Sequence, residues 1–394
     1  MKIMLFFSLG LLLAANNSNA ESYADFSGNL SFDARWFADE GLDSQDQDQL
    51  SVVIDPEFYL DSESGSQRLV VHPFYRYDSL DEERTHGDFR ELYWRGSSDT
   101  LDLMLGIGKV FWGVTESQHL VDVINQTDGV ENPDGEDKLG QPMAHLSWIN
   151  DWGTLEAYVM PYFRERTFAG IDGRLRAGWV VDTDHPLYES SAEDEHVDFA
   201  VRWSHYIGDW DLGIAHFKGT SRDPLFVADM VNQRLIPYYW QMEQTSIDLQ
   251  ATKGSWLWKL EAVYNQNGQQ DYTAAVGGFE YTSVGVFGTD ADLGWLLEYH
   301  YDDRDELATT PLEDDYFAGV RWVRNDVQST ELLAGVIVDA DNQATMTSVE
   351  ASRRLGDSWK LSMEARIFSG FESDDVLYSY RQDDYLEIRL ARYF

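Results

Sequence analysis

The chain has 394 residues, with 70 Asp and Glu against 29 Lys and Arg, and it contains no cysteine. This excess of carboxylates repels phosphate backbones and excludes a nucleic-acid-binding function, while the missing thiols exclude a disulfide framework and a thiolate metal site. Aromatic residues make up 14% of the chain, including 14 Trp and 21 Tyr. Such a content is typical of the interfacial belts of a membrane barrel, although large β-sandwich enzymes share it.

Residues 1–20 have the order of a secretory signal peptide. Lys2 precedes the apolar run 3–15, and Ser18-Asn19-Ala20 suits cleavage after Ala20. The apolar run is shorter than the roughly 20 residues of a transmembrane helix, which argues against the alternative of a retained membrane anchor. Because no later run approaches that length, the sequence excludes a helical membrane protein and predicts an exported mature chain, 21–394.

The first segments of the mature chain alternate apolar and polar side chains. This period of two runs through 26–36, 51–60 and 68–77 and predicts β-strands with one apolar face. Pro56 and Pro73 fall within these strands, and because proline donates no backbone hydrogen bond we expect a local bulge at each. A soluble sandwich would bury the apolar face and a barrel would turn it to lipid, so these strands leave both alternatives open.

A long polar segment then interrupts the alternation. The strand pair 88–96 and 100–110 is joined by a short turn, and at Trp112-Gly113 the chain leaves the strand pattern until about Gly129. Trp112 can wedge where the strand ends, and Gly113 allows the backbone to turn sharply.

The remainder repeats one plan of strands and connections. Strands resume at 141–149 and 153–164, and a long loop over 165–195 follows. Short turns then alternate with long acidic connections: the turns are 208–209, 253–255, 325–329 and 356–358, and the connections lie near 219–241, 302–315 and 370–383. Trp210, Trp256 and Trp359 directly follow short turns. This asymmetry is typical of outer-membrane barrels, in which short turns and an aromatic belt face the periplasm.

The last strand resembles the terminal signal that the barrel-assembly machinery of bacteria recognises. Leu386, Ile388, Leu390 and the terminal Phe394 share one face. We expect about 18 strands, with about 16 as the alternative because 240–252 and 272–286 are the weakest strand predictions, and a barrel of that size encloses an aqueous channel. The predicted fold is therefore all-β: a transmembrane, antiparallel, up-and-down β-barrel over 21–394.

Within such a barrel, we expect 114–128 to fold inward as a constriction loop. On an outer loop Leu120, Val121, Val123 and Ile124 would be exposed apolar groups, and these four also suggest one helical turn packed on the barrel wall. The alternative is an ordinary extracellular loop with capping residues. The residues that we expect to shape the constriction are Lys109, Trp112, Gly113, Glu116, His119, Asp122, Asn125 and Asp128.

The predicted lumen face carries both signs of charge. Acidic residues are interleaved with the arginines Arg35, Arg68, Arg76, Arg202, Arg321, Arg366 and Arg389. Opposed rows of charge would orient polar solutes, although pairing for stability is an equal alternative. The loops are strongly acidic; they favour a solvated surface over a calcium site, because no loop has the ligand spacing of a dedicated calcium loop. A negative mouth would admit cations or neutral solutes more easily than anions.

One stretch also supports a family resemblance. Trp112, Gly113, Glu116, Asp122, Ile124, Asn125 and Asp128 match the pattern of a strand ending in Trp-Gly, an acidic residue and then Asp-x-Ile/Val-Asn-x-x-Asp. In this the chain resembles a poorly characterised family of proteobacterial outer-membrane barrels. That family usually has a basic or amide residue earlier in the strand, and Lys109 takes that place here. The resemblance implies a porin-like barrel in the outer membrane; some members resemble importers of hydrophobic or aromatic compounds. It implies no substrate for this chain.

A catalytic site is the weaker interpretation of the same stretch. His119 with Ser117 and Asp122 is the one cluster that resembles a triad, but nearness in sequence is poor evidence for one. Metal binding by Glu116, His119 and Asp122 has no supporting ligand spacing. We therefore predict no enzyme activity, no cofactor and no metal.

The sequence thus predicts a porin-like channel of the bacterial outer membrane for passive diffusion of small solutes, favouring cations or neutral and hydrophobic compounds. Its expected partners are outer-membrane lipid and lipopolysaccharide, the barrel-assembly machinery and small-molecule solutes. The alternatives are a non-transporting assembly or scaffold protein and an enzyme active at the barrel rim. The oligomeric state is left open.

Overall fold

A computed structural model describes residues 23–268, 270–304, 308–373, 375 and 377–394. The predicted signal peptide, residues 1–20, lies outside the described residues. None of the helices within these ranges has the length and hydropathy that a membrane-spanning helix needs. Those helices are short 3-10 turns: η1 Glu193–Glu195, η2 Val286–Gly288 and η4 Tyr378–Tyr380.

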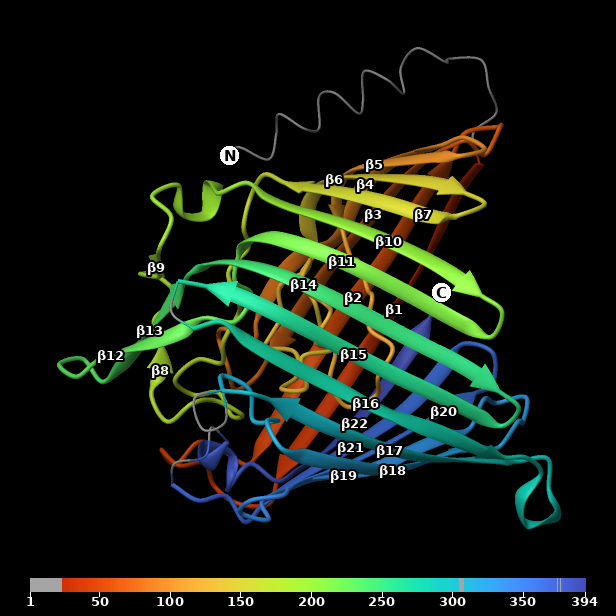
Figure 1. Ribbon diagram of the computed structural model, residues 1–394. Helices are drawn as coiled ribbons and strands as arrows, with labels where there is room; N and C mark the ends of the chain where they lie inside the picture. Colours follow the sequence, from red (N-terminus) through yellow and green to blue (C-terminus); the bar gives the residue numbers. More distant parts are fainter. Residues whose placement is uncertain (1–22, 269, 305–307, 374, 376) are drawn as a thin grey trace.

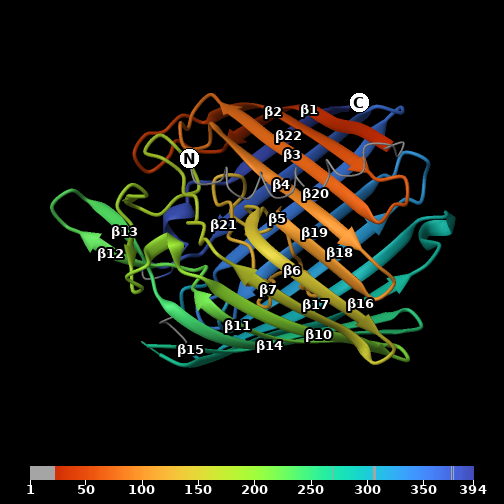
Figure 2. The same cartoon turned by 90° about the horizontal axis from the view of Figure 1, so that it is seen from above.

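The chain forms a closed, antiparallel, 18-stranded barrel, as predicted. Its strands are β1 Tyr23–Phe37, β2 Asp48–Asp61, β3 Gln67–Asp78, β4 His86–Ser97, β5 Leu101–Gly108, β6 Gln141–Asn150, β7 Gly153–Met160, β10 Asp198–Ile207, β11 Trp210–Thr220, β14 Gln241–Lys253, β15 Trp256–Asn267, β16 Tyr272–Ser283, β17 Asp292–Asp302, β18 Asp315–Val323, β19 Glu331–Asp339, β20 Thr345–Leu355, β21 Trp359–Ser369 and β22 Tyr385–Tyr393. Each pairs with its neighbours in sequence, and the strands wrap around one common interior (Figures 1 and 2).

The barrel closes where the last strand pairs with the first. β22 runs antiparallel to β1, with Tyr393 opposite Asn29 and Tyr385 opposite Phe37. Two backbone hydrogen bonds between Gly28 and Phe394, of 3.2 and 3.1 Å, extend this ladder to the end of the chain. Closure leaves no strand edge unpaired, which a β-structure in lipid requires because the hydrocarbon offers no hydrogen-bonding partners.

Alternation along each strand separates an apolar outer wall from a polar interior. In β17, Trp295 and Leu297 are 49% and 42% exposed on the outside, whereas Glu298 and His300 are 2% and 0% exposed on the inside. Trp210, Trp256 and Trp359 begin β11, β15 and β21, next to short turns, and each is 38% or 39% exposed. The outer wall therefore has the apolar surface and the aromatic residues near the turns that a lipid-facing barrel needs.

The two prolines behave differently. At Pro73 the register between β3 and β4 shifts by one residue after His72, which confirms the expected bulge. At Pro56 the register between β1 and β2 does not shift, so the bulge predicted there is wrong. Pro56 lies opposite Gly28 instead, and a Cβ on Gly28 would come within 2.6 Å of the Cα of Pro56. A glycine on the neighbouring strand thus makes room for the proline without a bulge.

Long loops gather at one end of the barrel and short turns at the other (Figure 1). The predicted strand 153–164 ends earlier, at Met160. The connection after it holds β8 Val180–Val181 and β9 Leu187–Tyr188, which pair with the hairpin β12 Leu225–Asp229 and β13 Arg234–Tyr239 in a small second sheet. The sequence did not predict this sheet, because the connection near 219–241 was expected to be a plain loop.

Insertion of a charge on the outer wall tests the lipid-facing assignment. Leu297→Arg should lower the free energy of unfolding by about 2–4 kcal/mol, because a guanidinium near the bilayer midplane is poorly solvated. The measurement is urea unfolding of the barrel refolded in phospholipid vesicles. Ser352→Arg is the matched control: Ser352 faces the lumen and its hydroxyl donates to Glu331 at 2.7 Å, so an arginine there can pair with that carboxylate. Equal losses for the two variants would contradict the assignment.

Candidate functional site

The connection between β5 and β6, residues 109–140, lies inside the barrel (Figures 1 and 2). We call it the inner loop. It includes the predicted segment 114–128 and continues beyond it. Most of its residues between Val121 and Val130 are buried, and they contact inward-facing side chains of strands on opposite sides of the barrel.

Asn125 fixes the base of the inner loop. Its side-chain amide donates to the carbonyls of Gly108 and Leu139, both at 2.9 Å, and its carbonyl oxygen accepts the N–H of Val110 at 2.8 Å. Asn125 is 2% exposed, so these three bonds satisfy an amide that burial would otherwise penalise. One side chain thereby joins the two ends of the loop where they leave the wall.

The turn at Trp112-Gly113 is held by a second polar residue of the loop. Asp122 accepts the N–H of Trp112 at 2.6 Å and that of Gly113 at 3.2 Å. A Cβ at Gly113 would come within 2.5 Å of the ring of His119, so the turn needs glycine. The helical turn expected around 120–124 is wrong: the backbone forms an irregular tight turn there, in which the N–H of Val123 donates to the carbonyl of Val121 at 2.9 Å.

Two carboxylates of the far wall hold the tip of the inner loop. Glu261 on β15 accepts the N–H groups of Val114, Thr115 and Val121 at 2.6, 3.0 and 3.1 Å. Glu298 on β17 accepts those of Glu116 and Ser117 at 2.8 and 2.9 Å. Both carboxylates are at most 2% exposed. They provide acceptors for a backbone that has left the sheet and would otherwise be unsatisfied in the barrel interior.

Charged side chains of the loop tip also find partners. Glu116 pairs with Arg321 on β18 at 2.6 Å and lies 3.5 Å from the ammonium of Lys259. His119 lies 3.0 Å from Glu136 and 3.7 Å from Glu261. Burial lowers the pKa of His119, but the two carboxylates outweigh burial and raise the pKa to about 10. The imidazole is therefore a cation at neutral pH and contributes to holding the loop.

The cluster that resembled a catalytic triad is not assembled. The hydroxyl of Ser117 donates to Glu298 and lies 2.9 Å from Nε2 of His300, while His119 is engaged by Glu136. Asp122 is occupied with backbone N–H groups. His300 itself is fully buried. These side chains therefore attach the loop to the wall, in place of the proposed catalytic pairing.

Apolar residues of the inner loop pack on one side of the barrel. Val121 and Ile124 are at most 1% exposed, and with Trp112 they form a buried cluster with inward-facing residues of β6, β7, β10, β11 and β14 to β16. Wall residues of this cluster include Met143, Tyr158, Met160, Phe217, Met242 and Val263. This part of the lumen wall is apolar, whereas the sequence predicted a lumen face with both signs of charge. The packing explains why the loop carries aliphatic residues.

On the other side of the barrel the loop is held by arginines. Glu131 receives hydrogen bonds from Arg76 on β3, the shortest of 2.6 Å. Arg76 also donates to Asp33 on β1 at 2.8 Å, and Asp33 in turn accepts Arg389 on β22 at 2.9 Å. Burial disfavours the charge of Glu131, yet its pairing with Arg76 holds its pKa at about 2. The loop therefore completes an ion-pair network that joins three strands.

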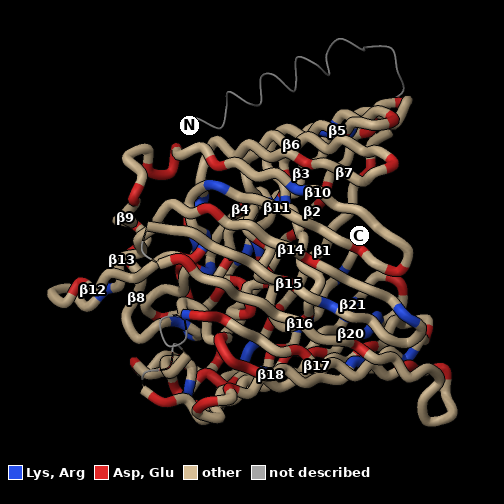
Figure 3. Tube along the Cα trace, in the orientation of Figure 1, with Lys and Arg blue, Asp and Glu red and all other residues tan. Residues whose placement is uncertain are grey.

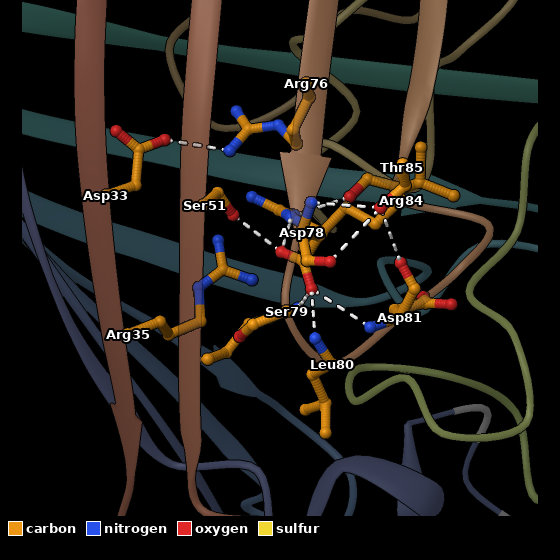
Figure 4. A network of polar contacts seen from close by, with 12 residues as sticks. Asp33, Arg35, Ser51, Arg76, Asp78, Ser79, Leu80, Asp81, Arg84 and Thr85 are labelled. Carbon is orange, nitrogen blue, oxygen red and sulfur yellow. Dashed lines mark hydrogen bonds and ion pairs between the residues drawn. The ribbon is translucent and has the colours of Figure 1, made fainter.

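Asp78, the last residue of β3, is the centre of a group of polar contacts next to this network (Figure 4). Asp78 accepts the hydroxyl of Ser51 at 2.6 Å and the N–H groups of Leu80 and Asp81 at 2.9 and 3.0 Å. It also lies 3.2 Å from Arg84, whose guanidinium donates to the carbonyl of Glu131 at 2.8 Å. The loop between β3 and β4 is thus tied to the inner loop.

Further along, the inner loop reaches β21. Asp134 pairs with Arg366 at 2.7 Å, and the amide of Asn132 donates to Glu364 at 3.2 Å. Burial raises the pKa of Asp134 to about 6 even though Arg366 opposes the shift. Burial, together with Glu131 and Asp134, also raises the pKa of Asp137 to about 6.

The arginines expected in the lumen all have carboxylate partners. Arg35 bonds Glu387, Arg202 bonds Asp248, and Arg68 bonds Asp61 near the short-turn end. Arg76, Arg321, Arg366 and Arg389 belong to the contacts described above. Arg68 is half exposed at the mouth, whereas Arg35 and Arg76 are almost fully buried. The inner loop supplies the acidic partners of three of them: Glu131 for Arg76, Glu116 for Arg321 and Asp134 for Arg366.

A cavity of about 490 Å³ remains between the inner loop and the short-turn end. Residues 109–112 form one side of it, and β4, β5, β6, β7 and β10 form the wall. Lys109 and Phe111 are exposed to it, with Phe111 61% exposed, whereas Trp112 is only 5% exposed. Of the predicted constriction residues, Lys109 is therefore the one that faces open space most directly.

One group of side chains has metal-ligand chemistry. His86, Asp128 and Glu131 each place a ligand atom within 4.8 Å of the others. However, Arg90 donates to Asp128 and Arg76 donates to Glu131. The two guanidiniums already supply the positive charge that a metal ion would bring.

The sequence predicted only some of the wall residues that hold the loop. Glu261 belongs to the acidic residues that alternate with arginines on the predicted lumen face, but its role as an acceptor for the loop backbone was not predicted, and Glu298 and His300 were not singled out. Each stands at an inward position of a strand that alternates with outward aromatic or aliphatic residues. That position marks them as buried polar residues in need of partners, but the partners lie more than 100 residues away, for example 146 between Thr115 and Glu261.

Of the comparisons with known proteins, the one with solved structures supports the fold. Neither a family model nor a curated protein matches the chain. Among solved structures, the chain is similar to Pseudomonas aeruginosa OccK5 (OpdH), with 10% sequence identity, a TM-score of 0.57 and coverage of 95% of this chain and 98% of that one. It also aligns with a triple mutant of Rhodopseudomonas blastica porin, at 13% identity and a TM-score of 0.46, over 94% of this chain and 100% of that one. At such identities only the fold is shared, and a TM-score below 0.5 adds no support to it.

Neutralising one wall carboxylate tests whether it holds the inner loop. Glu298→Gln keeps the size of the side chain but removes the charge that two loop N–H groups and Ser117 share, at a cost of about 1.5–3 kcal/mol per charged hydrogen bond. We expect faster amide hydrogen exchange across residues 109–140, measured by mass spectrometry on the protein in detergent.

The matched control for this variant is Glu243→Gln on β14. Glu243 points to the outer face, where it pairs with Lys218, and it does not contact the inner loop. Its substitution should leave exchange in the loop unchanged. If Glu298→Gln also left the loop unchanged, the wall carboxylates would not be what holds it.

Proposed function

We propose that the protein is a diffusion channel of the bacterial outer membrane, through which small solutes pass, and that the inner loop narrows its pore. The observation that carries the proposal is the combination of a closed 18-stranded barrel with a loop fixed across its interior. A barrel of this size is wide enough for an aqueous pore, and an ordered inward loop sets the size and chemistry of what passes.

The attachment of the loop supports a static constriction. Contacts from opposite walls, through Glu298 on β17 and Arg76 on β3, hold it at both ends of its path. A loop that only covered the mouth of the barrel would need neither the contacts with Glu298 nor those with Arg76. Lys109, Trp112, Gly113, Glu116, His119, Asp122, Asn125 and Asp128 take two roles in this proposal: Lys109 lies on the solute path, and the others keep the loop in position.

The charge distribution supports a preference for cations or neutral solutes. Acidic residues are frequent in the long loops at the left of Figure 3, and the whole chain has a formal charge of −41. Inside the barrel, most arginines are already neutralised by carboxylates. A solute entering from the loop side therefore meets a negative mouth first, which raises the local concentration of cations.

The two alternatives lack an observation that favours them. A scaffold protein would not need a loop placed across its lumen, and a rim enzyme would need an exposed nucleophile and base, whereas the described Ser117 and His300 are enclosed by the loop and the wall. Outer-membrane lipid, lipopolysaccharide and the assembly machinery remain the partners that we propose from the barrel and its C-terminal strand.

Conductance in planar bilayers tests the channel directly. The purified wild-type protein should give stepwise KCl currents, and deletion of 114–128 should raise the single-channel conductance several-fold because the pore widens. The variant should be checked for a folded barrel by its heat-sensitive gel mobility. A wild type and a folded deletion variant that both fail to conduct would overturn the proposal.

Reversal potentials test the role of the loop carboxylates. Asp134 and Asp137 have raised pKa values of about 6, so they are charged at about pH 7.5 and neutral at about pH 5. They therefore change charge at a higher pH than carboxyl groups usually do. The cation preference in a KCl gradient should therefore weaken as the pH falls through 6. Asp137→Asn should weaken it already at about pH 7.5 and reduce the change with pH. A preference for anions at about pH 7.5 would contradict the acidic pore.

A further inference from the structure

The cavity beside the inner loop contains two charges without ion-pair partners. Lys109 contributes an ammonium and Glu91 on β4 a carboxylate, and neither makes an ion pair with any residue that the structure describes. The other charged side chains of the cavity are already engaged: Arg95 with Asp102, Arg202 with Asp248 and Glu156 with His145. Lys109 and Glu91 attract each other without forming an ion pair, and the carboxylate of Glu91 accepts the backbone N–H of Lys109. These two coupled charges therefore remain to meet a solute.

Next to these charges the wall is aromatic and rigid. Tyr158 stacks on His145, with ring centroids 4.2 Å apart and planes 9° apart, and it meets Trp112 edge to face at 5.7 Å. The hydroxyl of Tyr158 donates to Glu156 at 3.0 Å, which fixes the ring. Phe111 adds an exposed ring from the loop. Tyr158 and Trp112 are only 2% and 5% exposed, so they support the cavity wall, and the ring that a solute can reach is that of Phe111, which meets His119 edge to face at 4.8 Å. A ring that is held before the solute arrives binds a bulky apolar group with little loss of side-chain entropy.

We propose that this cavity is a solute-binding subsite for a zwitterion, an α-amino acid with a bulky apolar side chain. Lys109 receives the α-carboxylate, Glu91 receives the α-ammonium, and Phe111 contacts the side chain. The volume of about 490 Å³ is within the range of small-molecule sites, which is about 300–1,000 Å³. The inference rests on the proposed channel function and adds to it a class of solute.

The charge balance of the site distinguishes a zwitterion from simpler solutes. A solute carboxylate without an amine would compete with Glu91 for Lys109 and leave the Glu91 carboxylate without a counterion. A solute amine without a carboxylate would leave the Lys109 ammonium without one. A partly buried charge that loses water without gaining a partner costs free energy, so either simpler ligand should bind more weakly than one that satisfies both groups.

Calorimetric titration of the full-length mature protein in detergent micelles tests the subsite, and it requires no current. L-phenylalanine should bind about tenfold more tightly than phenylacetate, phenethylamine or glycine, each of which lacks one of the three recognised groups. Phenylacetate binding as tightly as phenylalanine would overturn the zwitterion assignment, and so would equally tight phenethylamine. Undetectable binding of phenylalanine would overturn the subsite itself.

Single substitutions assign the two ends of the ligand. Lys109→Met should lower the affinity for phenylalanine about tenfold and remove its advantage over phenethylamine, while Glu91→Gln should remove its advantage over phenylacetate. The matched control is Lys360→Met: Lys360 is an inward-facing lysine of β21 that does not line the cavity, and its substitution should leave the affinity unchanged.

The outcomes separate this inference from the channel. Stepwise KCl currents without phenylalanine binding would overturn the subsite and leave the channel standing. Binding without any current would support the subsite and overturn passive diffusion. An equal loss of affinity in Lys109→Met and Lys360→Met would show a general effect of lumen charge and contradict the specific contact.

Discussion

The structure depends on hydrogen-bond acceptors for the backbone of a loop that lies inside a membrane barrel. Once residues 109–140 leave the sheet, their N–H groups lose strand partners and lie where water is restricted, so each needs an acceptor. Glu261 and Glu298 supply acceptors at the tip, and Asp122 and Asn125 supply them at the base. The inner loop is therefore ordered by carboxylates and amides that reach its backbone, and regular secondary structure is not needed.

The two sides of the lumen stabilise the loop by different physical means. On the β6 to β16 side the loop buries aliphatic side chains, such as Val121 and Ile124, against an apolar wall. On the β22 to β4 side, the charged network of Glu131, Arg76 and Asp33 holds it. Apolar burial stabilises the loop but is not directional, whereas the ion pairs fix the position of the loop. Between these two attachments the cavity near Lys109 is left open, at the place where the loop begins.

Period-two alternation predicted the strands and a number of about 18, while the choice of a barrel over a sandwich also needed the signal peptide, the asymmetry between turns and loops, and the terminal strand. Each strand repeats the same local rule, and the asymmetry between turns and loops fixes the direction, so no distant contact had to be known. The alternation did not predict which residues contact one another. Thr115 and Glu261 are 146 residues apart, and alternation shows only that Glu261 points inward. The helical turn failed for a related reason. The apolar run at 120–124 indicated burial correctly, but hydrogen bonds from outside the run decide its backbone shape, as with the bond from Val121 to Glu261.

Because the chain has no cysteine, one introduced thiol can report whether the inner loop lines the conducting path. The most direct measurement is the single-channel current of Phe111→Cys before and after addition of a bulky charged methanethiosulfonate reagent. Phe111 is 61% exposed within the barrel, so modification should lower the current in one step per channel. An unchanged current, with modification confirmed by mass spectrometry, would show that ions pass without meeting the loop and would contradict the account.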